Sequence, residues 1–339
     1  MRGFLWALAA ALSFGVSTPL IALASGTAGP WLTAAALYFG AALFAAPLAG
    51  SPRRALATLR RNGAAYAAIA VIGGTLAPAA FTAGLQLAGP LGASLALNLE
   101  GAFSIGLAAL AFKEHIGRRL VLAAAAILCG GLVLALQGGG NIGSSAGIGL
   151  VILSTALWAT DNALSSALRA ADTRVTVFWK TSIGALLALT VSIAFHERLP
   201  TIASLVALLA IGSVGYGASL WWYLQAQRSF GIARTASLFA VAPFIGAVTS
   251  LAMHARPVPP STILVVALMA LGVALHVTER HAHRHRHAPL EHDHLHRHDD
   301  GHHTHHDDPI WGEHVHAHRH CEEIHEHDHA PDPHHIHEH

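Results

Sequence analysis

Residues 119–137 read RLVLAAAAILCGGLVLALQ, a run with a single charged residue at its first position. Its length matches what a transmembrane helix needs to cross roughly 30 Å of hydrocarbon. The whole chain has this character, since 53% of its 339 residues are apolar and only 12% are charged. Ordinary soluble domains carry about a quarter charged residues. The stretch therefore predicts a protein that folds within a bilayer.

Nine further apolar runs of similar length indicate an all-α membrane protein with ten transmembrane helices. The first run follows Arg2 and passes through Pro19 without a clean cleavage pattern, so we interpret it as a helix and not as a signal peptide. The predicted spans are 3–24, 30–49, 64–86, 90–112, 119–137, 146–168, 174–195, 201–225, 232–254 and 260–278.

Basic residues alternate between the loops in a way that predicts the orientation. Loops on the cytoplasmic side of a membrane carry an excess of Lys and Arg. With the N-terminus inside, the outer loops hold only Arg198 and Arg256. We therefore expect a multi-pass protein of the cytoplasmic (inner) membrane, with its N-terminus and C-terminal tail in the cytoplasm. The inner loops hold Arg2, Arg53, Arg54, Arg60, Arg61, Lys113, Arg118, Arg119, Arg169, Arg174, Arg228, Arg234 and Arg280.

Glycines at equivalent places suggest that the membrane region consists of two copies offset by about 142 residues. Five spans per copy is an odd number, so the second copy must insert upside down, as in many secondary transporters. The alternative is that any ten-span protein can be divided into two groups of five. The predicted domains are two five-helix repeats, 1–140 and 141–280, and a tail, 281–339. The glycine pairs are Gly73 and Gly215, Gly89 and Gly231, and Gly130 and Gly272.

Polar side chains inside the predicted spans are the candidates for solute binding or coupling, because burying a charge in a bilayer is costly. They are Glu100 with its neighbour Asn98, Asp161 with its neighbour Asn162, and Lys180. Lys180 and Asp161 lie at similar depth, which permits an ion pair that simply neutralises two charges. In the functional alternative, a solute or proton competes for Asp161 or Glu100. Glu100 has no evident partner, and a protonated, hydrogen-bonded carboxyl is its structural alternative.

The tail is a separate region that holds 23 of the 27 histidines, because only four precede residue 281. It has few large apolar residues and cannot bury a core, so we expect disorder. Imidazole suits zinc, nickel and cobalt, which predicts metal buffering or sensing; adventitious metal affinity and pH sensing near about pH 6.5 are the alternatives. The candidate ligands are His281, His283, His285, His287, His292, His294, His296, His298, His302, His303, His305, His306, His314, His316, His318, His320, His325, His327 and His329.

Several stretches resemble those of a known transporter family. Residues 93–100 read ASLALNLE and are followed by an apolar helix and by Phe112-Lys113-Glu114, while residues 236–243 read ASLFAVAP. Together with Trp158 and Lys180, they are similar to the EamA-type carriers of the drug/metabolite transporter superfamily. The resemblance covers nearly all of residues 3–278. It implies two five-helix repeats and the transport of an organic metabolite or drug.

Two positions depart from the family pattern. Gly101 stands where these carriers usually have proline, and Arg256 stands where the loop glutamate of the first half would recur. The fold is in any case a poor guide to the solute.

Three functions remain in competition at this point. The first is a secondary transporter of a small metabolite or drug-like solute with a metal-binding tail. The second is a transporter of zinc, nickel or cobalt itself, in efflux or uptake, and the third is a non-transporting membrane metal sensor or reservoir. We expect no enzyme, because the chain lacks a nucleophile arrangement, a phosphate loop and an HExxH motif. We also expect no required cofactor and no nucleic-acid partner; whether the carrier forms a homodimer stays open.

Overall fold

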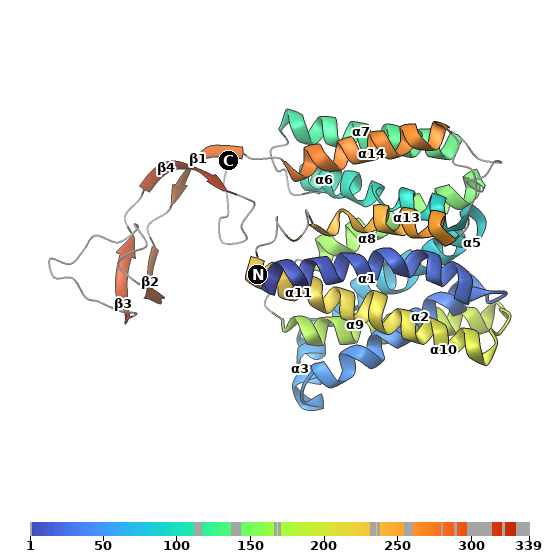
Figure 1. Cartoon of the computed structure of the whole chain (residues 1–339). Coiled ribbons are helices and arrows are strands. Elements are labelled where there is room, and N and C mark those ends of the chain that lie inside the picture. Colours follow the sequence, from blue (N-terminus) through green and yellow to red (C-terminus); the bar gives the residue numbers. More distant parts are fainter. Residues whose placement is uncertain are drawn as a thin grey trace. The chain divides into compact units, whose positions relative to one another are not determined.

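The computed structural model describes most of the helical region and part of the tail (Figure 1). Contacts divide the chain into two compact units, Met1–Glu279 and Arg280–His339. The described residues are 2–111, 117–136, 144–165, 168, 171–230, 235, 238–253, 260–278, 281–287, 290–296, 314–320 and 323–329.

Helices make up the membrane region in both halves. In the first half they are α1 (Arg2–Ser25), α2 (Pro30–Ala45), η1 (Ala46–Leu48), α3 (Pro52–Arg61), α4 (Gly63–Val71), η2 (Ile72–Leu76), α5 (Ala77–Ala96), α6 (Leu99–Ala111) and α7 (Arg118–Leu136). In the second half they are α8 (Ser145–Ser165), α9 (Thr173–Ala194), α10 (Ile202–Ile211), η4 (Gly212–Ala218), α11 (Ser219–Phe230), α13 (Ala242–Met253) and α14 (Pro260–Val277).

The described helices account for the ten predicted spans. Eight are long and apolar enough to cross a membrane, and α6 and α13 are shorter apolar helices. The predicted fold class, an all-α membrane protein built from two repeats, is therefore confirmed. Large apolar side chains such as Leu132 and Ile193 point outward, at 60% and 67% exposure, as expected for a surface that contacts lipid.

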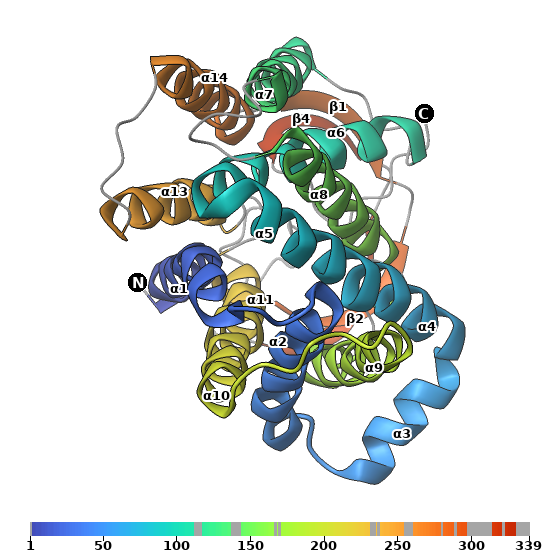
Figure 2. The same cartoon turned by 90° about the vertical axis from the view of Figure 1, so that its right-hand side faces the viewer.

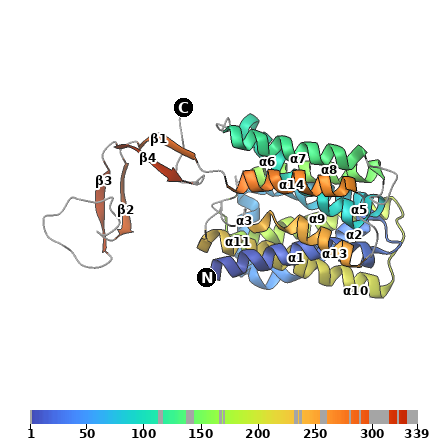
Figure 3. The same ribbon diagram turned by 45° about the horizontal axis from the view of Figure 1, so that its top comes forward.

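The two halves pack with matching neighbours, which is the signature of an inverted repeat. Figure 2 shows α2 beside α9 and α7 beside α14, each pairing one helix with its equivalent from the other half. Helix α8 packs against α5 and α6, and α1, which opens the other half, packs against α11 and α13. The turned view in Figure 3 shows the same helices running side by side along the length of the bundle.

The fourth and ninth spans are interrupted at equivalent points. The sequence predicts one span over 90–112, whereas helix α5 ends at Ala96 and α6 begins at Leu99. In the turn between them, the Asn98 amide bonds the Leu95 carbonyl at 3.1 Å, and in the second half the Val241 amide bonds the Leu238 carbonyl at 3.3 Å. These three-residue bonds lie 143 positions apart. Discontinuous helices at matching places in two repeats are a common mark of a transporter's binding site.

The connection between the third and fourth spans is so short that the range of α5 includes both sides of it. Gly89 there has a φ of 73° and a ψ of 167°, a conformation open almost only to glycine. Pro90 follows, lacks an amide hydrogen and disfavours a helical residue before it. The turn therefore reverses the chain with two residues.

Residues 52–61, which the sequence analysis places in an inner loop, form the short helix α3. Pro52 occupies its first turn, and the Ser51 side chain caps it by accepting a hydrogen bond from the Arg54 amide at 3.4 Å. Proline at the first helical position and serine at the cap both favour helix initiation. Hydropathy alone cannot show this helix because it is amphipathic and too short to cross a bilayer.

Paired strands are present in the described part of the tail. It contains the strands β1 (His281–His287), β2 (Leu290–His296), β3 (His314–His320) and β4 (Glu323–His329). Strand β1 pairs antiparallel with β4, and β2 with β3. Alternating residues favour extended backbone, but each sheet has two strands only and such pairs are marginally stable in water. The strands therefore add pairing to the tail without giving it a core.

We expect Gly89→Ala to lower the apparent melting temperature of the detergent-solubilised protein, at a cost of about 1–3 kcal/mol for the strained backbone. No neighbouring atom lies within 4 Å of the added methyl group, so the effect comes from the backbone alone. Gly149→Ala is the matched control, because Gly149 also has open space but lies within helix α8. Equal melting temperatures for Gly89→Ala and the wild type would contradict the strained turn.

Candidate functional site

A buried ion pair lies between the first two helices of the second half. The Lys180 Nζ on α9 donates to the Asp161 Oδ2 on α8. Asp161 is only 1% exposed, and the Lys180 side chain is 14% exposed. The ion pair that the similar depth of the two residues permits is thus present, and it joins α8 to α9. Removing one partner of such a pair leaves a buried charge, which is why these pairs hold their helices together.

Gly73, in the π-helical segment η2, lies directly against the Asp161 carboxylate of this ion pair. The Asp161 carboxylate lies against it so closely that a side chain at Gly73 would overlap the carboxylate. The Gly73 carbonyl accepts hydrogen bonds from the Tyr38 hydroxyl at 2.8 Å and from the Trp158 indole at 3.3 Å. One π-helical turn thereby connects α2 and α8. Single π-turns inside helices are frequent at functional sites.

One oxygen of the buried carboxylate has no hydrogen-bond partner among the described residues. This atom is the Asp161 Oδ1, whereas its Oδ2 receives the lysine. A buried acceptor without a partner costs free energy. It is also the place where a proton or a solute donor would be accepted without displacing Lys180.

Glu100 obtains a partner that the sequence does not reveal. The Asn162 Nδ2 on α8 donates to the Glu100 Oε1 at 2.9 Å. Glu100 is half-buried in the first turn of α6, directly after the interruption of the fourth span. A carboxylate is favoured at this end of a helix because the backbone amides there carry partial positive charge. Asp161 and Asn162 are neighbours on α8, so the Asp161 carboxylate and the Glu100 carboxylate of α6 lie beside adjoining residues of α8.

Asn98 lies beside this site, in the turn between α5 and α6. It is buried, and its side-chain amide donates to the Leu95 carbonyl at 3.0 Å and approaches the Met269 sulfur at 3.9 Å. This hydrogen bond to the Leu95 carbonyl helps to close the turn between α5 and α6. Four of the five intramembrane candidates therefore form two pairs, one between α8 and α9 and one between α6 and α8, and Asn98 lies in the turn before α6.

Aromatic rings line the same level of the bundle. Trp158 lies 5.5 Å from Phe81 and 6.5 Å from Phe14 between ring centroids. Tyr216 in the second π segment, η4, lies 5.7 Å from both Phe14 and Tyr38. These are the separations at which aromatic rings attract one another. The cluster connects α1, α2, α5 and α8 with η4, and it extends from the Gly73 hydrogen bonds into the second half.

The charged residues of the site have no charged counterparts at the equivalent positions of the other repeat, although the helices around them are repeated. Lys180 on α9 has Tyr38 as its counterpart on α2, because the two positions are 142 residues apart (180 − 38 = 142). At the offset of 143 found for the interrupted spans, Glu100 corresponds to Pro243. The charged groups therefore belong to one side of the pseudo-symmetric arrangement, and the other side supplies aromatic and apolar groups.

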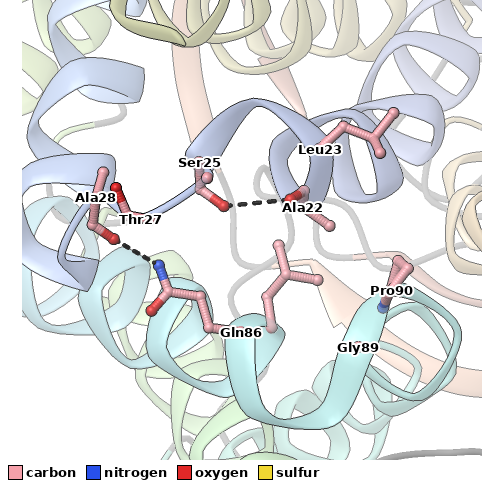
Figure 4. Close-up of a pocket in the computed structure, with 10 residues that line it drawn as sticks. Ala22, Leu23, Ser25, Thr27, Ala28, Gln86, Gly89 and Pro90 are labelled. Atoms are coloured by element: carbon pink, nitrogen blue, oxygen red, sulfur yellow. Dashed lines mark hydrogen bonds between the residues drawn. The ribbon is translucent and has the colours of Figure 1, made fainter. Parts of the chain in front are cut away.

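A pocket of about 440 Å³ lies elsewhere, at the turn around Gly89 (Figure 4). Its lining comes from the end of α1, the following loop and α5, and it contains no charged residue. The Gln86 side chain in this pocket donates to the Ala28 carbonyl at 2.9 Å, and the Ser25 hydroxyl donates to the Ala22 carbonyl at 3.3 Å. Without a charged residue, and with the Gln86 amide and the Ser25 hydroxyl bonded internally, the pocket is a less suitable solute site than the carboxylates.

The tail candidates are described only in their backbone. Antiparallel register places histidine opposite histidine in six pairs. Of the other candidates, His287 and His320 lie opposite Glu323 and Leu290, and His298, His302, His303, His305 and His306 lie outside the described residues. The six pairs are His281 with His329, His283 with His327, His285 with His325, His292 with His318, His294 with His316 and His296 with His314.

Comparison with known proteins identifies the family. The profile of the EamA-like transporter family matches residues 1–136 and 145–278, one match in each half. The chain belongs to this family. A solved crystal structure with 18% sequence identity matches 80% of this chain and 94% of its own length, with a TM-score of 0.57, and this likeness shows the fold alone. A search of curated proteins finds no match.

The sequence did not place Tyr38 or Gly73 at this site, and it did not connect Asn162 with Glu100. Their partners lie 35, 85 and 62 residues away along the chain, so no local pattern connects them. The glycine pair Gly73-Gly74 was the one available signal, since two adjacent glycines in a span loosen the helix. The loop motif Phe112-Lys113-Glu114 and Arg256 lie outside the described residues.

We expect Lys180→Met and Asp161→Asn to destabilise the protein strongly when introduced singly, by about 3–5 kcal/mol each, because each leaves an unpaired buried charge. The double variant should lose clearly less stability than the sum of the two single losses. Denaturation of the three variants in the same detergent measures this coupling. Arg174→Gln is the control, because Arg174 and Asp172 form an exposed pair whose loss costs about 1 kcal/mol or less. Strictly additive losses would show that the two groups do not stabilise each other.

Proposed function

We propose that the protein is a secondary transporter that moves a small metabolite or drug-like solute across the cytoplasmic membrane. Membership of the EamA-like family supports transport of a small solute. The observation that carries the proposal is the pair of carboxylates on adjoining parts of α8 and α6, one held by Lys180 and one by Asn162. Ionisable groups at membrane depth that face other helices commonly mark a solute or proton path.

In this proposal the two carboxylates have different roles. Asp161 keeps Lys180 as its counter-ion and orients it, so that the ion pair positions α8 against α9. Glu100 is half-buried and is held by one neutral amide, so a proton or a donor group of the solute can replace Asn162 at low cost. Binding at Glu100 adjoins the turn between α5 and α6, where the helix is already interrupted. Loading and release of Glu100 can therefore be coupled to movement of a half-helix.

The positions of the basic loops support an orientation with the N-terminus and the tail in the cytoplasm. In that orientation the tail is exposed to cytoplasmic metal. We assign it metal buffering or sensing for zinc, nickel or cobalt, supported by the six histidine pairs of the strand register. Directly opposed residues of an antiparallel pair have Cβ atoms about 4.5–5.5 Å apart, a separation that two ligands of one metal ion can bridge.

A divalent metal as cargo is less well supported by the membrane region. Where side chains are described, no three His, Cys, Asp or Glu residues are close enough to hold one metal ion. Cys129 is exposed on α7, and His196 is exposed at the end of α9. The carboxylates Glu100 and Asp161 are instead joined to an amide and an ammonium group, which suits an organic solute or a proton.

Glu100→Gln should abolish any change in solute distribution that the intact protein causes, because it removes the titratable, partly accessible carboxylate. The measurement compares organic solutes, zinc, nickel and cobalt inside cells that express the intact chain, Glu100→Gln or a chain ending at Arg280. Glu197→Gln is the control, since Glu197 bonds the Trp31 and Leu32 amides outside the site.

The outcomes separate the competing functions. An organic solute whose level depends on Glu100 and not on the tail supports the proposal. Metal content that changes with the intact chain and returns to baseline with Glu100→Gln would make metal the cargo. Metal content that depends on the tail alone, with no solute affected by Glu100→Gln, would leave a non-transporting sensor or reservoir.

We further expect zinc to bind the intact purified protein with several equivalents more than the chain ending at Arg280, because most imidazoles lie in the tail. Isothermal titration of both proteins measures the difference. Binding should weaken as pH falls through about 6.5, since imidazole must be neutral to bind a metal. Equal zinc binding by both proteins would remove the tail's assigned role.

A further inference from the structure

Helix α3 has a basic face and an apolar face. Its arginines Arg53, Arg54, Arg60 and Arg61 are all exposed. At 100° per residue they fall on one side of the helix, and Ala55, Leu56 and Leu59 fall on the other. A short helix of this kind has one side suited to water and charge and one suited to an apolar surface.

The apolar side attaches α3 to the transmembrane helices. Ala55 is buried, and its carbonyl accepts a hydrogen bond from the Trp179 indole on α9 at 2.9 Å. Leu59 packs against a small cluster that contains Tyr66 and Ile69 of α4. Leu56 remains 41% exposed. The helix is therefore fixed in position with one leucine available to lipid.

The basic side has no charge partner within the described part of the chain. The ion pairs found there are Lys180 with Asp161 and Arg174 with Asp172, and neither includes an arginine of α3. The last turn holds Arg60 and Arg61, which complement the helix dipole, but this accounts for two of the four charges only. Four exposed arginines on a ten-residue helix form a site for anions.

The position of α3 determines which anion is nearest. It follows the span Pro30–Leu48 and precedes the span that begins at Gly63, so it lies at the membrane surface and not far from it. Figure 2 shows α3 at the rim of the bundle, beside α4 and α9 and away from the other helices. The anions nearest to its free side would then be those of lipid headgroups. Basic residues beside a membrane attract anionic lipids by about 1 kcal/mol each.

We propose that helix α3 is a binding site for the phosphate headgroups of anionic phospholipids, with its four arginines as ligands. The anchor on α9 is Trp179, next to Lys180 in sequence, so the lipid-binding helix is bonded to the helix that carries the buried ion pair. Lipid binding at α3 does not depend on the proposed transport. It requires only that α3 stays folded and at the membrane surface.

The test supplies the purified intact protein with equal amounts of phosphatidylglycerol and phosphatidylcholine that have the same acyl chains, and counts bound lipids by native mass spectrometry. The wild type should retain phosphatidylglycerol preferentially. Arg60→Gln/Arg61→Gln should reduce this preference by about fivefold per arginine removed, and neutralising all four arginines should abolish it. The matched control is Arg118→Gln/Arg119→Gln, another exposed arginine pair at the end of a helix.

Three results would overturn the proposal. The first is an unchanged preference in the variant with all four arginines replaced. The second is an equal loss in the control pair, which would assign the preference to basic residues in general. The third is displacement of phosphatidylglycerol by an equal concentration of glycerol phosphate, which would indicate a site for a free anion. Matching melting temperatures of variant and wild type ensure that a loss of lipid reflects charge and not unfolding.

Discussion

A charge inside a bilayer must have a partner, and the arrangement of this bundle follows from that constraint. Lys180 and Asp161 would each be too costly alone, so α8 and α9 can pack only in a register that brings them together. That register in turn requires a residue without a side chain at position 73, because the carboxylate occupies the space of a Cβ atom there. The π-helical turn of η2 then directs the Gly73 carbonyl to Tyr38 and Trp158. One ion pair thus fixes four helices.

The two repeats share the helical scaffold, whereas the charged residues of the site occur at positions where the repeats differ. The interrupted spans and the π segments recur in both halves at offsets of about 142 residues. At the charged positions the halves differ, since Tyr38 stands for Lys180 and Pro243 for Glu100. Two identical half-sites would add a second set of like charges to the interior of the bundle, where repulsion is weakly screened. A single charged half-site avoids this repulsion and still benefits from the movement that inverted repeats allow.

The sequence was sufficient for the features that depend on composition over a whole span. Apolar runs located the ten spans, matched glycines indicated the repeat, and similar depth permitted the contact between Lys180 and Asp161. It was insufficient for features set by a few backbone angles or by distant contacts. The predicted spans leave a connection at 87–89, but hydropathy does not give the backbone angles of Gly89. The break at Asn98 lies inside the apolar stretch 90–112, where hydropathy does not change. Asn162 was named as a candidate, yet its bond to Glu100 depends on how α6 packs on α8.

The tail shows how an alternating pattern can determine register without a core. Histidines at every second position share one face of a strand, and a shift of one residue would place each paired histidine opposite a residue other than histidine. Pairing of this kind gains little from burial, because each sheet has two strands. A metal ion shared by opposed histidines would contribute its binding free energy to the pairing, as folding and metal binding are linked. The spacing of the histidines, more than their number, would then decide how strongly the tail responds to metal.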